Sequence, residues 1–155
     1  MDESDYENPW TQDGRPFSSS GLEDHVGFVY LITNLLDGRK YIGQKKLWSH
    51  KFLVKRFKNG KKGRRKVIID SDWKTYYGSN KELQEDVKRL GAPNFKREVI
   101  RVCKTKGLMN YEELREQMIH DVLRDDSYYN SFAGMRIHRA HVKGGDDGPQ
   151  PGEEA

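Results

Sequence analysis

The chain has 155 residues, of which 34% are hydrophobic and 34% are charged, and its formal net charge is +4. This length holds one domain of about 100–130 residues with flexible ends. The single cysteine, Cys103, excludes an intramolecular disulfide and a cysteine-rich zinc site. No stretch approaches the roughly 18–20 apolar residues that cross a bilayer. We therefore expect a soluble, cytoplasmic protein without a membrane partner.

The charges are distributed unevenly along the chain. Residues 1–24 carry seven acids and one arginine, and residues 144–155 carry four acids and no base. Both ends are rich in Gly, Ser or Pro and lack hydrophobic periodicity, which predicts an acidic disordered N-terminal segment and an acidic Gly/Pro-rich tail. The remaining domain, residues 25–143, is more basic than the whole chain and favours a polyanionic partner.

The first elements form a predicted hairpin. Residues 26–33 and 40–44 read as strands on either side of an Asp37-Gly38 turn signal. The next segment, residues 45–66, contains eleven Lys or Arg residues and no acid, and we call it the basic insertion. A solvated or disordered loop is the general interpretation of such a charge run.

The second half alternates between helix and strand signals. Ser71 precedes a short helical turn, and Asn80 caps a helix that continues through Leu90 and ends at Gly91. Residues 95–103 predict a third strand. Residues from about 108 to 123 predict an amphipathic helix, whose apolar stripe is Tyr111, Leu114, Met118 and Val122. The order indicates an α+β fold, in which helices flank a small three-stranded antiparallel sheet.

The basic insertion has a second interpretation. Its cations are interleaved with Trp48, Phe52 and Phe57, a combination that favours contact with nucleic-acid phosphates and stacking on bases. We expect phosphate contacts from five residues of this segment and one beyond it: Lys45, Lys46, Lys55, Arg64, Arg65 and Lys74.

Two aromatic signatures, Gly27-Phe28-Val29-Tyr30 and Tyr41-Ile42-Gly43, are separated by ten residues. Further along the chain come residues 71–79 and 81–100, then Tyr111-Glu112-Glu113 and Asn130. In their order and spacing, these segments of residues 26–130 resemble the GIY-YIG nuclease superfamily, in particular its small phage-type, Seg-like homing endonucleases. Phe28 stands where the family usually has glycine. The resemblance implies a metal-dependent DNA endonuclease, encoded by a phage or mobile element and acting on DNA as a monomer or transient dimer.

In that family one glutamate holds a single divalent ion, Mg²⁺ or Mn²⁺, and such ions prefer oxygen ligands. The resemblance selects Glu113 as this ligand. Glu116 is the alternative, because Glu113 lies opposite the predicted apolar stripe on a helical wheel. A solvated surface acid is the plain interpretation of either residue.

The resemblance also assigns roles around the metal. Tyr30 would orient or deprotonate water, Tyr41 would position the phosphate, and Gly43 would let the backbone approach the substrate. Asn130 would orient groups of the site. The structural alternatives are strand tyrosines that cover the sheet and an ordinary turn asparagine.

The family arginine has no aligned counterpart. Its expected position falls near Lys51, within the basic insertion; Arg56 is the nearest arginine and Lys74 a second candidate. A lysine supplies charge without a bidentate fork. This departure, together with Phe28, supports a catalytically inactive DNA-binding module on the same fold as the alternative function. A basic protein-interaction adaptor is a third possibility.

Overall fold

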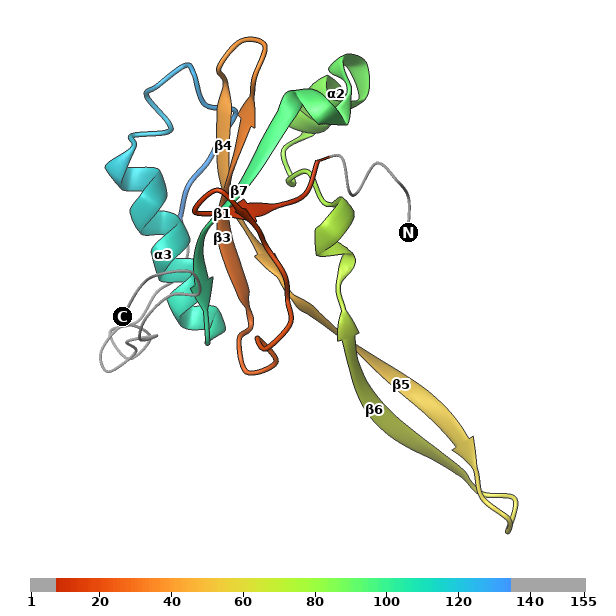
Figure 1. The fold of residues 1–155 in the computed structure, drawn as a ribbon. Coiled ribbons are helices and arrows are strands. Elements are labelled where there is room, and N and C mark those ends of the chain that lie inside the picture. The colour runs from red at the N-terminus through yellow and green to blue at the C-terminus, as the bar shows by residue number, and fades with distance from the viewer. Residues whose placement is uncertain (1–7, 135–155) are drawn as a thin grey trace.

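The computed structural model describes residues 8–134, in which two helices pack on opposite faces of a five-stranded sheet (Figure 1). The strand order is β2-β1-β7-β3-β4. The centre is antiparallel and comprises β3 (Gly27–Asn34), β4 (Lys40–Lys46) and β7 (Phe95–Cys103). This confirms the predicted α+β class and the three central strands. The sheet is larger than predicted, because β1 (Thr11–Gln12) pairs parallel to β7 and β2 (Arg15–Pro16) pairs with β1.

The expected disorder of residues 1–24 does not hold for residues 8–24. Trp10 is 1% exposed and its indole donates a hydrogen bond to the Trp73 carbonyl, 2.6 Å away. Leu22 is also buried, and Phe17 packs against the same core. The acidic composition of the segment conceals these few large apolar side chains, whose burial offsets the entropy of ordering the chain.

The alternation of side chains along β3 builds a core on each face of the sheet. Phe28, Tyr30 and Ile32 face α2 (Lys81–Leu90), together with Trp10, Trp73 and Leu83. Val29 points the other way and packs with Ile42, Cys103 and Met109 beneath α3 (Lys106–Ile119). No helix among residues 8–134 has the length and apolar character needed to span a membrane.

The local boundary signals are confirmed. The Ser71 hydroxyl accepts a hydrogen bond from the Trp73 amide at the start of the 3₁₀ helix η1 (Asp72–Thr75). The Asn80 side chain accepts one from the Leu83 amide and caps α2. Gly91 ends α2 at φ +94°, before the short η2 (Ala92–Asn94), and only glycine adopts such a φ without strain.

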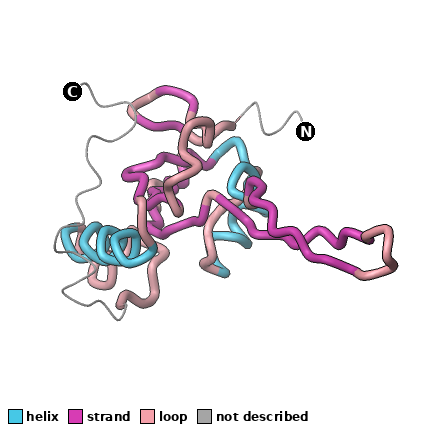
Figure 2. The backbone as a smooth tube through the Cα atoms, turned by 90° about the horizontal axis from the view of Figure 1, so that it is seen from below, coloured by secondary structure: helices cyan, strands magenta, loops and turns pink. Residues whose placement is uncertain are grey.

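The basic insertion is an ordered hairpin rather than a loop. β5 (Trp48–Arg56) and β6 (Lys62–Asp70) pair antiparallel as a separate two-stranded sheet that projects from the domain (Figures 1 and 2). Its base is anchored, since the Trp48 indole donates to the carbonyls of Leu22 and His25. Asp70 accepts hydrogen bonds from Ser19 and Trp73. We call residues 48–70 the β5–β6 arm.

Candidate active site along the edge of β4

β4 is the edge strand of the sheet, and a groove of about 590 Å³ runs along it. Strand β4, the turn before α2, helix α3 and the last described residues all contribute to its walls. We call it the β4 groove; its lining includes Tyr41, Gln44, Lys45, Lys46, Tyr76, Ser79, Asn80, Lys106, Asn110, Glu113, Gln117, Ser131 and Phe132.

A polar stripe of α3 forms one wall of the groove. Lys106, Asn110, Glu113 and Gln117 recur at steps of four, three and four residues, so they share one helix face. The predicted apolar stripe is confirmed only at Val122, which is 1% exposed and packs in the core although it follows the end of the helix at Ile119. Tyr111 and Leu114 are partly exposed, and Met118 is 51% exposed. The buried positions of α3 are Leu108, Met109, Glu112 and Gln117. Two of these are polar, and hydrophobic periodicity cannot identify them.

Glu113 is the acid of the groove. Burial raises the pKa of its carboxyl to about 7, and the Gln44 amide acts in the opposite direction. Glu116 does not line the groove and lies 3.6 Å from His120. Glu112 also points elsewhere, toward Arg101 and Arg115 at 3.8 and 3.5 Å. The geometry therefore favours Glu113 over Glu116 as the groove's candidate cation ligand.

Among the lining residues that the structure describes, the groove offers a cation one carboxylate, that of Glu113, rather than a protein cage. Among residues 8–134, no three side chains of His, Cys, Asp and Glu lie together as a metal-binding cluster. Mg²⁺ commonly keeps several waters and uses one or two carboxylates plus substrate phosphate. A half-buried carboxylate in an open groove fits that mode of binding.

The two candidate tyrosines stand at different depths. Tyr41 lines the groove, and its hydroxyl is hydrogen-bonded to that of Ser79 at 2.9 Å. Tyr30 lies behind it, with ring centroids 6.1 Å apart, and is 0% exposed. The Tyr30 hydroxyl makes no hydrogen bond to the residues that the structure describes. Burial, and secondarily Tyr76, raises the pKa of Tyr30, and burial also raises that of Tyr41, so both phenols are protonated at neutral pH.

Gly43 is opposite Tyr30 in the β3–β4 register. A Cβ atom at Gly43 would lie 2.4 Å from the Tyr30 hydroxyl, so glycine is required to accommodate that phenol. Phe28, at the position of the usual family glycine, is 0% exposed and packs edge-on against Trp10 with centroids 5.1 Å apart. The substitution thus places a core side chain away from the groove.

Asn130 lies against the exposed edge of β4. Its amide oxygen accepts from the Ile42 N–H at 3.1 Å, and its amide nitrogen donates to the Ile42 carbonyl at 2.8 Å. Gln117 donates to the same carbonyl at 3.2 Å. Tyr129 N donates to the Lys40 carbonyl at 2.7 Å, so residues 127–130 replace a missing neighbouring strand. Asn130 is therefore a structural neighbour of Tyr41.

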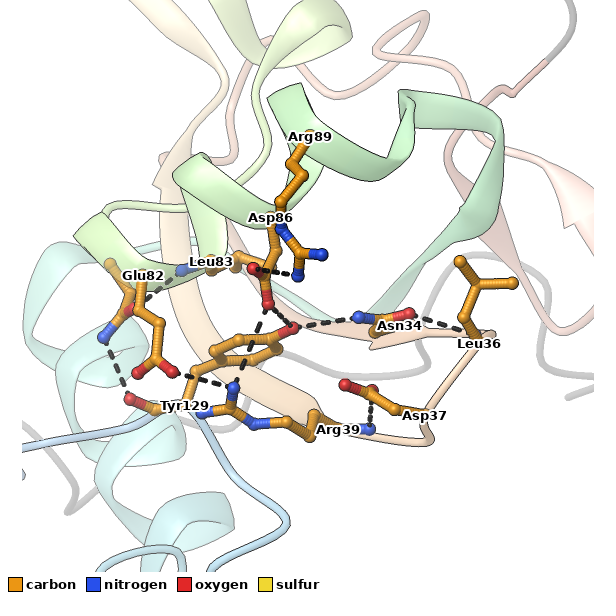
Figure 3. Close-up of polar contacts among 10 residues, drawn as sticks. Asn34, Leu36, Asp37, Arg39, Glu82, Leu83, Asp86, Arg89 and Tyr129 are labelled. Atoms are coloured by element: carbon orange, nitrogen blue, oxygen red, sulfur yellow. Dashed lines mark hydrogen bonds and ion pairs between the residues drawn. The ribbon is translucent and has the colours of Figure 1, made fainter.

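A polar network clamps the segment that carries Asn130 (Figure 3). The Tyr129 hydroxyl donates to Asp86 at 2.8 Å and accepts from Asn34 at 3.1 Å. Arg39 stacks over the Tyr129 ring, 3.9 Å from its centroid, and is hydrogen-bonded to Glu82. The network joins β3, the β3–β4 turn, α2 and the chain after α3. It holds Tyr129, the residue before Asn130, with side chains from distant parts of the sequence.

Three lysines line the groove, and the predicted arginine does not. Lys45 is paired with Asp72 and lies 4.2 Å from the Tyr76 ring centroid, while Lys46 and Lys106 stand nearby. Arg56 is instead at the outer end of β5, opposite Lys62. The structure does not bring Arg56 to the site, because the basic insertion folds outward as a hairpin.

The other predicted phosphate-binding residues lie in two places, neither of which is the β4 groove. Lys55, Arg64 and Arg65 lie on the β5–β6 arm. Lys74 lies on η1 over the Trp73 ring, 5.6 Å from its centroid, and does not line the groove. Our predictions include Tyr41, Lys45, Lys46 and Glu113 of the lining and omit the rest, among them Gln44, Tyr76, Lys106 and Asn110. The helical spacing of Lys106, Asn110, Glu113 and Gln117 is the signal that would have revealed that wall. The end of the predicted domain, residues 135–143, and the predicted acidic tail, residues 144–155, lie outside the described residues.

Comparison with known proteins gives concordant matches. The family model described as "Putative endonuclease segE, GIY-YIG domain" matches residues 10–133. The "Putative endonuclease segE" of Enterobacteria phage T4 is 31% identical over 108 residues, which are 69% of this chain and 41% of that protein. The chain thus spans about two fifths of the length of that relative. No solved structure matches. Because the family model covers well over half of the chain, the chain belongs to the GIY-YIG nuclease family and, within it, to the SegE-type domain.

Proposed function

We propose that this domain is a metal-dependent endonuclease that hydrolyses phosphodiester bonds in DNA. The observation that carries the proposal is the convergence of Tyr41, Glu113 and three lysines on one groove beside an edge strand. Membership of the GIY-YIG family and the name of the phage relative support the same reaction class. A cationic groove suits a polyanionic substrate.

Glu113 is the residue that would hold Mg²⁺ or Mn²⁺. The bound ion would supply Lewis acidity and neutralise phosphate charge. In the protein alone the carboxyl is desolvated and its pKa is about 7. A cation beside it would favour the ionised form, so the site is matched to a positively charged ligand at neutral pH.

The remaining residues orient and neutralise the substrate. Tyr41, protonated at neutral pH, would donate a hydrogen bond to a phosphate oxygen or to the attacking water. Lys45, Lys46 and Lys106 would stabilise the charge that develops on phosphate in the transition state. The Tyr30 hydroxyl is buried behind Tyr41 and has no hydrogen-bond partner among the described residues, so it would contact the attacking water only after the side chains around it move on substrate binding.

Metal-dependent nicking of supercoiled plasmid tests the proposal. We expect cleavage with Mg²⁺ or Mn²⁺ that is lost in EDTA and reduced at least about 100-fold in Glu113→Gln. Tyr41→Phe should reduce it as well. Glu116→Gln is the matched control, because it removes the same charge from the same helix outside the groove, and it should retain activity. A protein that binds DNA and never cuts it would exclude the endonuclease.

A catalytically inactive DNA-binding module is the second candidate. The observation that favours it is the complete burial of Tyr30, which places its hydroxyl out of reach of solvent. This candidate predicts salt-dependent DNA binding that Glu113→Gln leaves unchanged and no cleavage with either metal ion.

The resemblance to Seg-like enzymes extends the proposal to a homing role. In that role the protein would act in the cytoplasm of a phage-infected cell and cut DNA that lacks its own gene. Matched plasmids with and without the gene and its flanking sequence provide the test. Equal cutting of both plasmids would oppose homing and leave the endonuclease proposal intact.

A further inference from the structure

We propose that the β5–β6 arm inserts into the major groove of duplex B-form DNA and supplies most of the salt-dependent affinity of the protein. This inference rests on the proposed function for the identity of the polyanion. It adds a duplex-binding element that is separate from the β4 groove.

The arm stands clear of the domain. Figures 1 and 2 show its two strands extending beyond the remaining elements. Past its anchored base, most side chains are exposed, including Phe52 at 57%, Val54 at 66% and Ile68 at 56%. An isolated two-stranded hairpin is at best marginally stable in water. Contact with a partner would therefore stabilise the outer part of the arm, which makes few contacts with the rest of the domain.

The dimensions of the arm fit a DNA groove. Each strand has nine residues, which corresponds to about 30 Å at roughly 3.3 Å per residue. One turn of B-form DNA advances about 34 Å, and its major groove admits a two-stranded β-ribbon. Because the groove winds around the helix axis, its path over one turn is longer than this rise, and the arm is long enough to lie in the major groove over part of one turn.

The charge of the arm selects a polyanion. Residues 51–66 contain nine Lys or Arg residues and no acid. This charge density opposes association with a second copy of the same arm. It also protects the unpaired strand edges against edge-to-edge pairing. Charge complementarity thus identifies phosphate as the partner group.

Both faces of the ribbon mix cations with apolar groups. The register places four cations on one face, which we call the four-cation face: Arg56, Lys62, Arg64 and Lys66. Phe52 and Val54 lie between them, and Arg64 stacks over the Phe52 ring at 5.4 Å. On the other face, Phe57 covers Gly63. Arginine and apolar side chains are suited to guanine edges and thymine methyl groups, respectively.

The arm begins next to the candidate active site. Lys45 and Lys46 line the β4 groove, and β5 starts at Trp48, two residues later. Trp48 and Asp70 hold the base of the arm against the core. One duplex can therefore contact the groove through a phosphodiester and the arm through its adjacent major groove.

This mode of binding discriminates among nucleic acids. The major groove of A-form RNA is deep and narrow and excludes such an element, and a single strand has no groove. We expect the arm to increase affinity for duplex DNA, with little effect on duplex RNA or single-stranded DNA of the same sequence.

An arm-shortened variant tests the inference. Residues 51–67 are replaced by Asn-Gly, a two-residue hairpin turn, because His50 and Ile68 are directly paired. This change leaves the anchors Trp48 and Asp70 in place. Binding to a 30-base-pair duplex is measured by fluorescence anisotropy in EDTA between 50 and 200 mM salt. If about four of the nine cations contact phosphates, the slope of log K against log salt falls by roughly three to four.

A second, full-length variant tests the same inference in case the arm-shortened protein does not fold. The four-cation face is neutralised as Arg56→Gln, Lys62→Gln, Arg64→Gln and Lys66→Gln. Its matched control removes four exposed cations elsewhere: Arg15→Gln, Lys88→Gln, Lys96→Gln and Arg124→Gln. The first variant should lower the slope by at least two. The control should have a small effect, although its net charge is the same.

Competitors identify the groove that the arm occupies. Methyl green, which binds the major groove, should displace the wild-type protein, and distamycin, which binds the minor groove, should not. Equal slopes for wild type and arm-shortened protein would overturn the inference, as would arm-dependent binding to duplex RNA or to phosphatidylserine vesicles without binding to DNA. Because binding is measured without metal, an absence of cleavage would count against the endonuclease alone.

Discussion

The side chain of Asn130 makes hydrogen bonds with both backbone polar groups of Ile42, 88 positions earlier in the chain. It thereby replaces a neighbouring strand at the open edge of β4. Ile42 lies between Tyr41 and Gly43, so this contact holds the backbone that presents Tyr41 to the β4 groove. Asn130, the last residue of the expected site, therefore holds the Tyr41-Ile42-Gly43 signature in place through hydrogen bonds to its backbone.

Asn130→Ala should destabilise the domain by about 1–3 kcal/mol, because the Ile42 N–H loses its acceptor in a buried position. Urea unfolding measures the change. Asn130→Asp is the matched variant: its carboxylate places a second acceptor and a buried charge against the Ile42 carbonyl, whereas its protonated form both accepts from the N–H and donates to the carbonyl. Asp should therefore cost at least as much as Ala at pH 7 and less than Ala at pH 4, and a pH-independent difference between the two variants would contradict this account of the contact.

Tyr30→Phe should leave stability unchanged or raise it by up to about 1 kcal/mol, because it removes a buried hydroxyl without a partner among the described residues. The same substitution should lower the nicking rate. Thermal melting and the plasmid assay are measured on one preparation. Full activity in Tyr30→Phe would show that this tyrosine only covers the sheet.

Glu113 should make stability depend on pH. Burial raises the pKa of its carboxyl from 4.5 to about 7, so the stabilising contribution of the neutral form is complete below about 4.5 and is lost as pH rises through 7. Without metal, wild type should therefore lose melting temperature from pH 5 to pH 8 relative to Glu113→Gln. Added Mg²⁺ should restore part of it. Parallel curves for the two proteins would contradict the prediction.

Lys45 should supply the charge that the family obtains from arginine. Lys45→Gln should reduce the nicking rate by roughly 10- to 100-fold through loss of transition-state stabilisation, and Lys45→Arg should retain more activity. Lys74→Gln is the control, since Lys74 lies outside the groove. A larger loss of nicking rate in Lys74→Gln than in Lys45→Gln would show that Lys74 on η1, and not Lys45, supplies this charge.

Arg97 should be important for stability. It is 1% exposed, and its guanidinium donates to the carbonyls of Asn8, Lys74 and Tyr76. Arg97→Met should lower the free energy of unfolding by about 3 kcal/mol. Hydrogen bonds to charged groups are worth about 1.5–3 kcal/mol each, and the total is less than the sum of the three bonds because the contributions are not additive. Arg124→Met, at an exposed position, should stay within about 0.5 kcal/mol. Urea unfolding of both variants provides the comparison, and equal effects would refute the role of Arg97.

The local elements and the family were predictable from the sequence. The strands at 27–34, 40–46 and 95–103 and the caps at Ser71 and Asn80 follow from alternation and turn chemistry. These signals act over a few residues, and they correctly predicted the order in which the central strands and α2 follow one another along the chain. The two tyrosine signatures likewise identified the nuclease family.

Tertiary structure decided which residues meet. Trp10 enters the core, the basic insertion projects as an arm, and α3 turns Glu113 rather than Glu116 toward the groove. Each outcome depends on surfaces supplied by distant parts of the chain, such as Trp73 for Trp10 and Ile42 for Gln117. The sequence alone determined the family and the backbone conformation of the three central strands and of α2. Packing between remote segments determined the faces of those elements, and therefore the composition of the site.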